Sequence, residues 1–136
     1  RGIVMRDPAN VLVVSTGIMT KRALEAADIM ASHGFTCGVV HMHTIKPFDS
    51  ELLMSIVPDV DLVVTAEEHM RNGGLGTVVL ETLNDSLGGD YPQVLRLGIP
   101  DCFSDDYGSQ DSVLETWGLS AKGIARSAES QLSRVV

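Results

Sequence analysis

The segment from Glu67 to Gly76 holds the densest group of reactive and flexible residues in the chain. Two carboxylates, an imidazole and a guanidinium precede three glycines there. Free backbone amides at the start of a helix can bind an anion, so Gly73, Gly74 and Gly76 form a candidate anion site. Neither common phosphate-binding pattern is complete, because the third glycine of G-x-G-x-x-G falls on Val79 and no Gly-Lys-Ser/Thr follows. Glycines also let a helix pack closely on a sheet, and we favour that explanation.

Glu67, Glu68 and His69 have the side chains of a general acid–base pair or of one side of a metal site. Successive residues near the end of a strand point to opposite sides of the sheet, which separates adjacent groups. We therefore predict that Glu67 and His69 form hydrogen bonds or face an interface. No residue is assigned a catalytic role, and the Gly-x-Ser-x-Gly pattern of serine hydrolases is absent from the sequence.

His41 and His43 stand two residues apart, so on an extended strand they would share a face and could ligate zinc. A third ligand would have to come from His33, Cys37 or His69, and none of these lies at a recognised ligand spacing. We therefore favour core or solvated histidines over a metal site.

Strands and helices alternate along the chain. Short apolar or β-branched runs predict strands at residues 3–5, 11–14, 36–41, 62–65 and 94–97. The run at residues 11–14 is continuous, as expected for a strand covered on both faces of the sheet. Helical spacing of apolar residues and capping residues predict helices near residues 18–32, 50–56, 74–87, 109–117 and 120–135. Asp49 or Ser50 can cap the second of these, and Gly34 suits a left-handed turn at the end of the first. This order requires right-handed βαβ crossovers, and it predicts a three-layer α/β/α fold with a mainly parallel sheet of about five strands.

The first predicted strand, residues 3–5, is expected to be an antiparallel edge strand. A tight turn at Pro8–Asn10 would pair it with residues 11–14, and parallel pairing would need a longer crossover. Ligands of parallel sheets gather at the carboxyl ends of the strands. Residues 15–17, 41–47 and 67–76 follow strands and are expected to meet at that edge.

Composition limits the classes of partner. The chain has 136 residues with a formal net charge of −8, which suits one domain spanning residues 1–136 and disfavours nucleic acids and anionic membranes. The longest apolar run, residues 11–14, is too short to cross a membrane, and no basic-then-apolar leader opens the chain. Cys37 and Cys102 form no disulfide framework, so we expect a cytoplasmic protein. The absence of an initiator methionine is consistent with a piece of a longer polypeptide.

Several motifs in order resemble the C-terminal domain of the transketolase family, which includes transketolase, 1-deoxyxylulose-5-phosphate synthase and the pyruvate dehydrogenase beta subunit. Residues 44–49 are similar to the family's T-I-K-P-L-D segment, with Phe48 in place of the leucine. Residues 65–69 and 73–76 are similar to its T-x-E-E-H and G-G-L-G signature. Further similar blocks are residues 13–17, 23–27, 96–103, 108, 118–120 and 124, whereas residues 104–107 form an acidic departure.

The resemblance implies that this chain is part of a larger transferase that uses thiamine diphosphate and magnesium. In that family a G-D-G … N-N segment of the diphosphate-binding domain holds the cofactor, and a glutamate of the pyrimidine-binding domain activates it. Neither segment can be located here, so no cofactor-binding, metal or catalytic residue is expected in this chain. The family's C-terminal domain packs on the pyrimidine-binding domain and supports a homodimer, which makes the following residues interface candidates: Glu67, Glu68, His69, Gly73, Gly74 and Gly76.

The leading hypothesis is therefore an assembly domain, inactive alone, of an enzyme that transfers a two-carbon or acyl unit. The alternative is an autonomous anion- or nucleotide-binding module that uses the helix start at residues 73–76, and Gly74→Val would abolish its ligand binding. A histidine metal protein built on His41 and His43 is a third hypothesis.

Overall fold

A computed structural model describes residues 2–7, 9–17, 19–70, 73–100 and 117–135. The strands are β1 (Gly2–Arg6), β2 (Val11–Ser15), β3 (Cys37–Met42), β4 (Leu62–Met70) and β5 (Gln93–Pro100). The helices are α1 (Met19–Ser32), α2 (Ser50–Ile56), the short 3₁₀ helix η1 (Val57–Asp59), α3 (Leu75–Leu87) and α5 (Ala121–Val135). The helix predicted at residues 109–117 and Cys102 fall largely or wholly outside the described residues.

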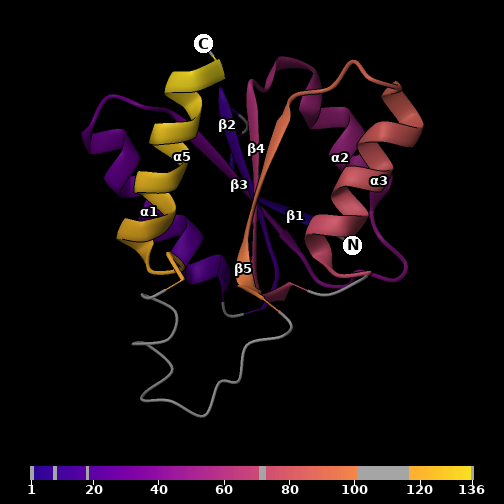
Figure 1. Ribbon diagram of the computed structural model, residues 1–136, viewed down its shortest axis with the longest axis horizontal. Helices are drawn as coiled ribbons and strands as arrows, with labels where there is room; N and C mark the ends of the chain where they lie inside the picture. The colour runs from indigo at the N-terminus through magenta and orange to yellow at the C-terminus, as the bar shows by residue number, and fades with distance from the viewer. Residues whose placement is uncertain (1, 8, 18, 71–72, 101–116, 136) are drawn as a thin grey trace.

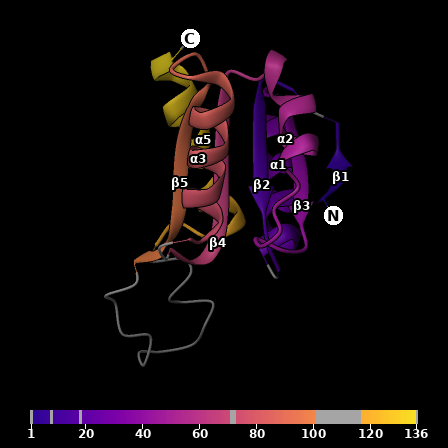
Figure 2. The same ribbon diagram turned by 90° about the vertical axis from the view of Figure 1, so that its right-hand side faces the viewer.

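The strands form one sheet in the order β1-β3-β2-β4-β5, in which β1 is antiparallel to β3 and the other neighbours are parallel. Helices α1 and α5 cover one face of the sheet, and α2 and α3 cover the other (Figures 1 and 2). The predicted three-layer α/β/α fold with an antiparallel edge strand is thereby confirmed.

The continuous apolar run of β2 follows from its central position. Val11 and Val13 pack on the α1/α5 side, whereas Leu12 and Val14 pack on the α2/α3 side, and all four are fully buried. Because side chains alternate between the two faces of a strand, a strand covered on both sides must be apolar at every position.

Two sequence expectations on the strands are corrected. Strand β1 does not pair with β2 through a tight turn; it pairs with β3, with Gly2 opposite Met42 and Val4 opposite Val40. Both edges of β2 are taken by the parallel strands β3 and β4, and β1 pairs instead along the outer edge of β3. Strand β4 does not end at Thr65 but continues to Met70, with a register irregularity between Ala66 and His69.

Local signals at the helix ends are confirmed. Asp49 caps α2, because its Oδ1 accepts a hydrogen bond from the Leu52 backbone N–H at 3.1 Å. Its Oδ2 accepts another from the Gly2 N–H at 3.0 Å and so ties the edge strand to this helix. Gly34 follows α1 with φ +87, the left-handed conformation that glycine adopts without strain.

No helix within the described part of the chain is long and apolar enough to cross a membrane.

Candidate functional site

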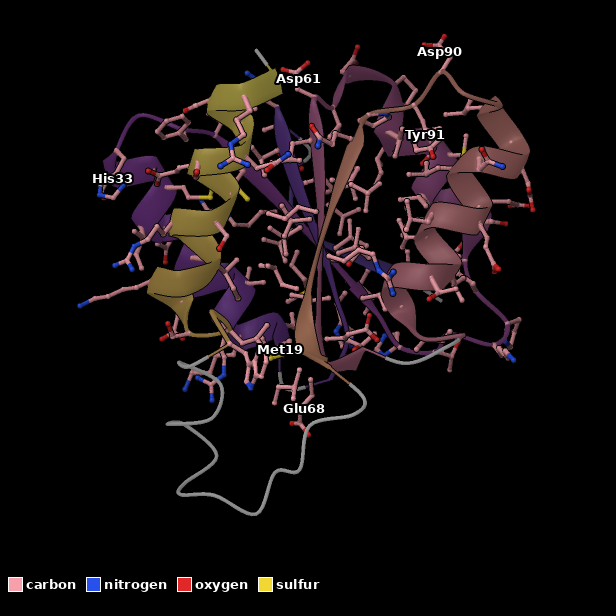
Figure 3. The ribbon with its side chains drawn as sticks, viewed as in Figure 1. Met19, His33, Asp61, Glu68, Asp90 and Tyr91 are labelled. Atoms are coloured by element: carbon pink, nitrogen blue, oxygen red, sulfur yellow. The ribbon has the colours of Figure 1, made fainter. Side chains whose placement is uncertain are left out.

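The candidate site lies where the order of strands along the sheet reverses. From β2 the chain passes through α1, on one face of the sheet, to the parallel strand β3. From β3 it passes through α2, on the other face, to β4 on the opposite side of β2. The carboxyl ends of β2 and β4 flank this reversal, with Ser15 paired to Ala66. Glu68, just beyond Ala66, lies at this edge of the sheet (Figure 3). In open parallel sheets this is the position where ligands bind.

Glu67 turns inward and holds the start of α3. Its Oε1 accepts a hydrogen bond from the Leu75 backbone N–H at 3.0 Å, and its Oε2 accepts one from the Gly76 N–H at 2.8 Å. The residue is only 5% exposed. A carboxylate is stabilised there by two charge-assisted hydrogen bonds and by the positive end of the helix dipole. The anion at the start of α3 is therefore a side chain of the same chain.

The glycines of the segment have separate structural reasons. Gly73 has φ +75, a left-handed conformation in which a side chain would be strained. A Cβ added to Gly76 would lie 2.5 Å from Arg96 Nε and 3.2 Å from the buried hydroxyl of Thr65. At Gly76 the explanation from close helix–sheet packing is thus confirmed.

Arg96 is a contact that the sequence did not indicate. Its guanidinium crosses the first turn of α3 beside Gly76, and its Nη2 donates a hydrogen bond to Thr77 Oγ1 at 3.1 Å. The ammonium of Lys46, from the loop after β3, lies 3.8 Å from the position of a Cβ on Gly73. Side chains from β5 and from the β3–α2 loop therefore both lie beside the glycine segment.

A second polar group joins the carboxyl ends of β2 and β3. Ser15 Oγ lies 2.8 Å from Thr20 Oγ1, which in turn lies 2.5 Å from His41 Nδ1. Ser15 is fully buried and Thr20 is 9% exposed. The sequence did not indicate this Ser15–Thr20–His41 relay, because its hydrogen bonds join residues of three separate elements, β2, α1 and β3.

The surroundings of His41 and His43 do not support the hypothesis of a histidine metal site. The rings of His41 and His43 meet edge to face with centroids 4.6 Å apart. Among the described residues, however, no group of three or more histidines, cysteines and acids is close enough to hold a metal ion. His33 instead contacts Glu129, and Cys37 is buried in β3.

Two titratable groups have shifted pKa values. Burial, and then the neighbouring His43, lower the pKa of His41 below 6.5. Burial raises the pKa of the Cys37 thiol to about 12, which keeps it protonated and unreactive.

The predicted interface residues occupy one stretch of the chain but face different ways. Glu67 faces the interior, and Gly74 and Gly76 are buried beneath neighbouring groups. Glu68 and Gly73 are half-buried and open to the outside. His69 lies in β4, with its side chain outside the described part of the structure.

The fold is therefore a mainly parallel sheet with helices on both faces. Its glycine and acid segment, residues 67–70 and 73–76, lies where the order of strands along the sheet reverses. A family model described as "Transketolase, C-terminal domain" matches residues 1–124. The chain belongs to the transketolase C-terminal domain family.

The relatives agree with this assignment. The chain is 38% identical over 125 residues to a 1-deoxy-D-xylulose-5-phosphate synthase of Caldanaerobacter subterraneus subsp. tengcongensis, covering 92% of this chain and 20% of that protein. It is also 38% identical over 131 residues to the 6-deoxy-6-sulfo-D-fructose transketolase subunit SqwH of a Clostridium species, covering 96% of this chain and 39% of that protein. The chain therefore spans only about one to two fifths of the length of these enzymes.

Solved structures show the same fold. The structure titled "Split gene transketolase, inactive beta4 tetramer" superposes with a TM-score of 0.87 at 35% identity, covering the whole of this chain and 43% of that one. A transketolase of Pichia stipitis shares the fold at 20% identity, with a TM-score of 0.70 over 98% of this chain and 18% of that one.

Proposed function

We propose that this chain is the assembly domain of a thiamine-diphosphate-dependent, transketolase-like enzyme. The whole enzyme would transfer a two-carbon or acyl unit, and the chain alone would be inactive. Its relatives are enzymes of which a domain like this forms a minor part. The proposed role is to pack on the pyrimidine-binding domain and to support a homodimer, with the diphosphate-binding domain on the same chain or on a separate subunit.

The structural observation that most supports this proposal is the position of the Glu67 carboxylate at the start of α3. It binds the two amides at the start of α3 that a phosphate group would otherwise use. An incoming anion would have to displace a buried carboxylate and would be repelled by its charge. This geometry argues against the alternative of an autonomous anion- or nucleotide-binding module at residues 73–76.

The cofactor does not fit the residues of this segment. A diphosphate needs free hydrogen-bond donors, such as backbone amides at the start of a helix, and its magnesium is usually held by one or two carboxylates besides the phosphates. Here the Glu67 carboxylate instead binds the amides of Leu75 and Gly76 itself, so neither is free for a diphosphate. We therefore assign the cofactor to other domains of the enzyme.

Residues 67–70 and 73–76 are instead suited to form a fixed contact surface for a neighbouring domain of the enzyme. Glu67 fixes the end of β4 to α3, and the Ser15–Thr20–His41 relay fixes β2 to β3. The other described groups near this edge are small or polar: Glu68, Gly73, Lys46 and His43. Polar groups around closely approaching backbone are typical of contacts between domains of one enzyme.

Titration calorimetry with thiamine diphosphate and magnesium tests the proposal. The isolated chain is expected to show no saturable heat, whereas the assembled enzyme should bind the cofactor stoichiometrically. Micromolar binding by the chain alone would contradict the proposed division of roles. Loss of that binding on Gly74→Val would support the anion-binding module in its place.

A further inference from the structure

A cavity of about 570 Å³ lies between α1 and α5, away from the glycine segment. Its volume is within the range of roughly 300–1,000 Å³ of small-molecule sites. Ile29 near the end of α1 and Phe35 just beyond it form apolar walls and pack against the core, and Ala125 of α5 adds a third apolar surface. His33, at the same end of α1, is visible beside α5 on this side of the molecule (Figure 3).

Two cations line the same cavity. Lys122 and Arg126 are four residues apart on α5, so their side chains share one face of the helix. They are notable because the chain as a whole carries a formal charge of −8. A local pair of positive charges within an acidic molecule concentrates anions at that place.

The carboxylate that lines the cavity is already bound. Glu129 Oε2 lies 2.8 Å from His33 Nδ1, and this contact joins α5 to the end of α1. Glu129 is therefore held toward His33 by a direct hydrogen bond. The lining thus combines apolar walls, two cations and one partnered carboxylate.

We propose that this cavity binds a small organic anion that has an apolar part. The apolar part would lie against Ile29, Phe35 and Ala125, and the anionic group would contact Lys122 and Arg126. Pockets of this kind use an apolar lining for affinity and a few charged groups for orientation. The site is independent of the interface role proposed for the glycine segment.

Phenyl phosphate is a suitable probe, because it joins an apolar ring to a dianion. Backbone amide shifts of the ¹⁵N-labelled full chain, followed by NMR, would report its binding. We expect saturable shifts at the end of α1 and along α5, and weaker binding of inorganic phosphate, which lacks the apolar part. High salt should weaken phenyl phosphate binding, because exposed charges are screened.

The double variant Lys122→Gln/Arg126→Gln separates this site from general anion binding. Its dissociation constant for phenyl phosphate should rise about fivefold or more, the effect of losing two exposed charge contacts. The matched control Lys21→Gln removes an exposed cation of α1 that does not line the cavity, and binding should be unchanged. Both lysines and Arg126 are exposed, so the variants should fold, as circular dichroism can verify.

Three results would overturn the proposal. The first is an absence of saturable shifts on α1 and α5. The second is equal weakening by the control variant. The third is binding of an acidic peptide with no response to phenyl phosphate, which would show that the cavity is a contact site for another protein.

Discussion

Replacing Glu67 tests the arrangement at the carboxyl edge most sharply. Glu67→Gln keeps the size of the side chain but removes its charge and one of its two acceptor oxygens. Glu67 is 5% exposed, and its carboxylate oxygens lie 3.0 and 2.8 Å from the Leu75 and Gly76 nitrogens. The variant therefore leaves one buried N–H facing an amide that cannot accept its hydrogen bond.

The expected loss follows from these contacts. A hydrogen bond to a charged group contributes about 1.5–3 kcal/mol, and an unsatisfied buried donor costs about 1–3 kcal/mol. Because these terms overlap, we expect Glu67→Gln to lower the free energy of unfolding by about 2–3 kcal/mol. Glu67→Ala, which removes both acceptors and leaves a space, should lower it by about 3–5 kcal/mol.

Urea unfolding followed by far-UV circular dichroism measures this change. With a slope of about 2 kcal/mol per molar urea, the midpoint of Glu67→Gln should fall by about 1 M or more. The matched control is Glu81→Gln, an exposed carboxylate on the same helix, α3. It should change stability by less than about 0.5 kcal/mol. If Glu67→Gln were as mild as this control, the assigned role of Glu67 would be wrong.

Three further predictions concern the rest of the fold. Gly123→Ala should destabilise the chain by about 1–3 kcal/mol, because its Cβ would lie 2.7 Å from the Gly118 backbone; a wild-type urea midpoint would refute this. Cys37 has a pKa of about 12 and is buried, so iodoacetamide should modify it only after unfolding, as peptide mass spectrometry can show, and rapid labelling of the native chain would contradict the burial. The pKa of His41 is lowered in the folded chain, so the unfolded chain binds its proton first and stability should fall as the pH drops below 6.5. His41→Gln should flatten that part of the profile of urea midpoint against pH, and an unchanged slope would rule out His41 as its source.

Local signals in the sequence predicted much of the fold, because their causes are local. The uninterrupted apolar run from Val11 to Val14 predicted a strand covered on both faces, which is its position in β2. Asp49 or Ser50 predicted a helix start, for which the structure uses Asp49, and Gly34 predicted a helix end. A capping side chain and a left-handed turn each depend on only a few neighbouring residues.

The pairing of β1 and the contacts of Glu67 depend on distant parts of the chain. Strand β1 bypasses its nearest neighbour in sequence because both edges of β2 are taken by β3 and β4. The sequence suggested hydrogen bonds for Glu67 but did not identify the Leu75 and Gly76 amides, which reach it only because β4 continues past Ala66 and α3 starts at Leu75. The Thr20–His41 contact likewise spans 21 residues and requires α1 to pack on β3.

Hydrogen–deuterium exchange can show whether the carboxyl edge contacts a neighbouring domain, by comparing the 136-residue chain alone with the same domain in the assembled enzyme. We expect assembly to slow exchange at the carboxyl edge, in residues 41–47, 67–70 and 73–76. Unchanged exchange at that edge, or slowing confined to the outer surface of α1 and α5, would contradict the claim that the glycine and acid segment contacts a neighbouring domain.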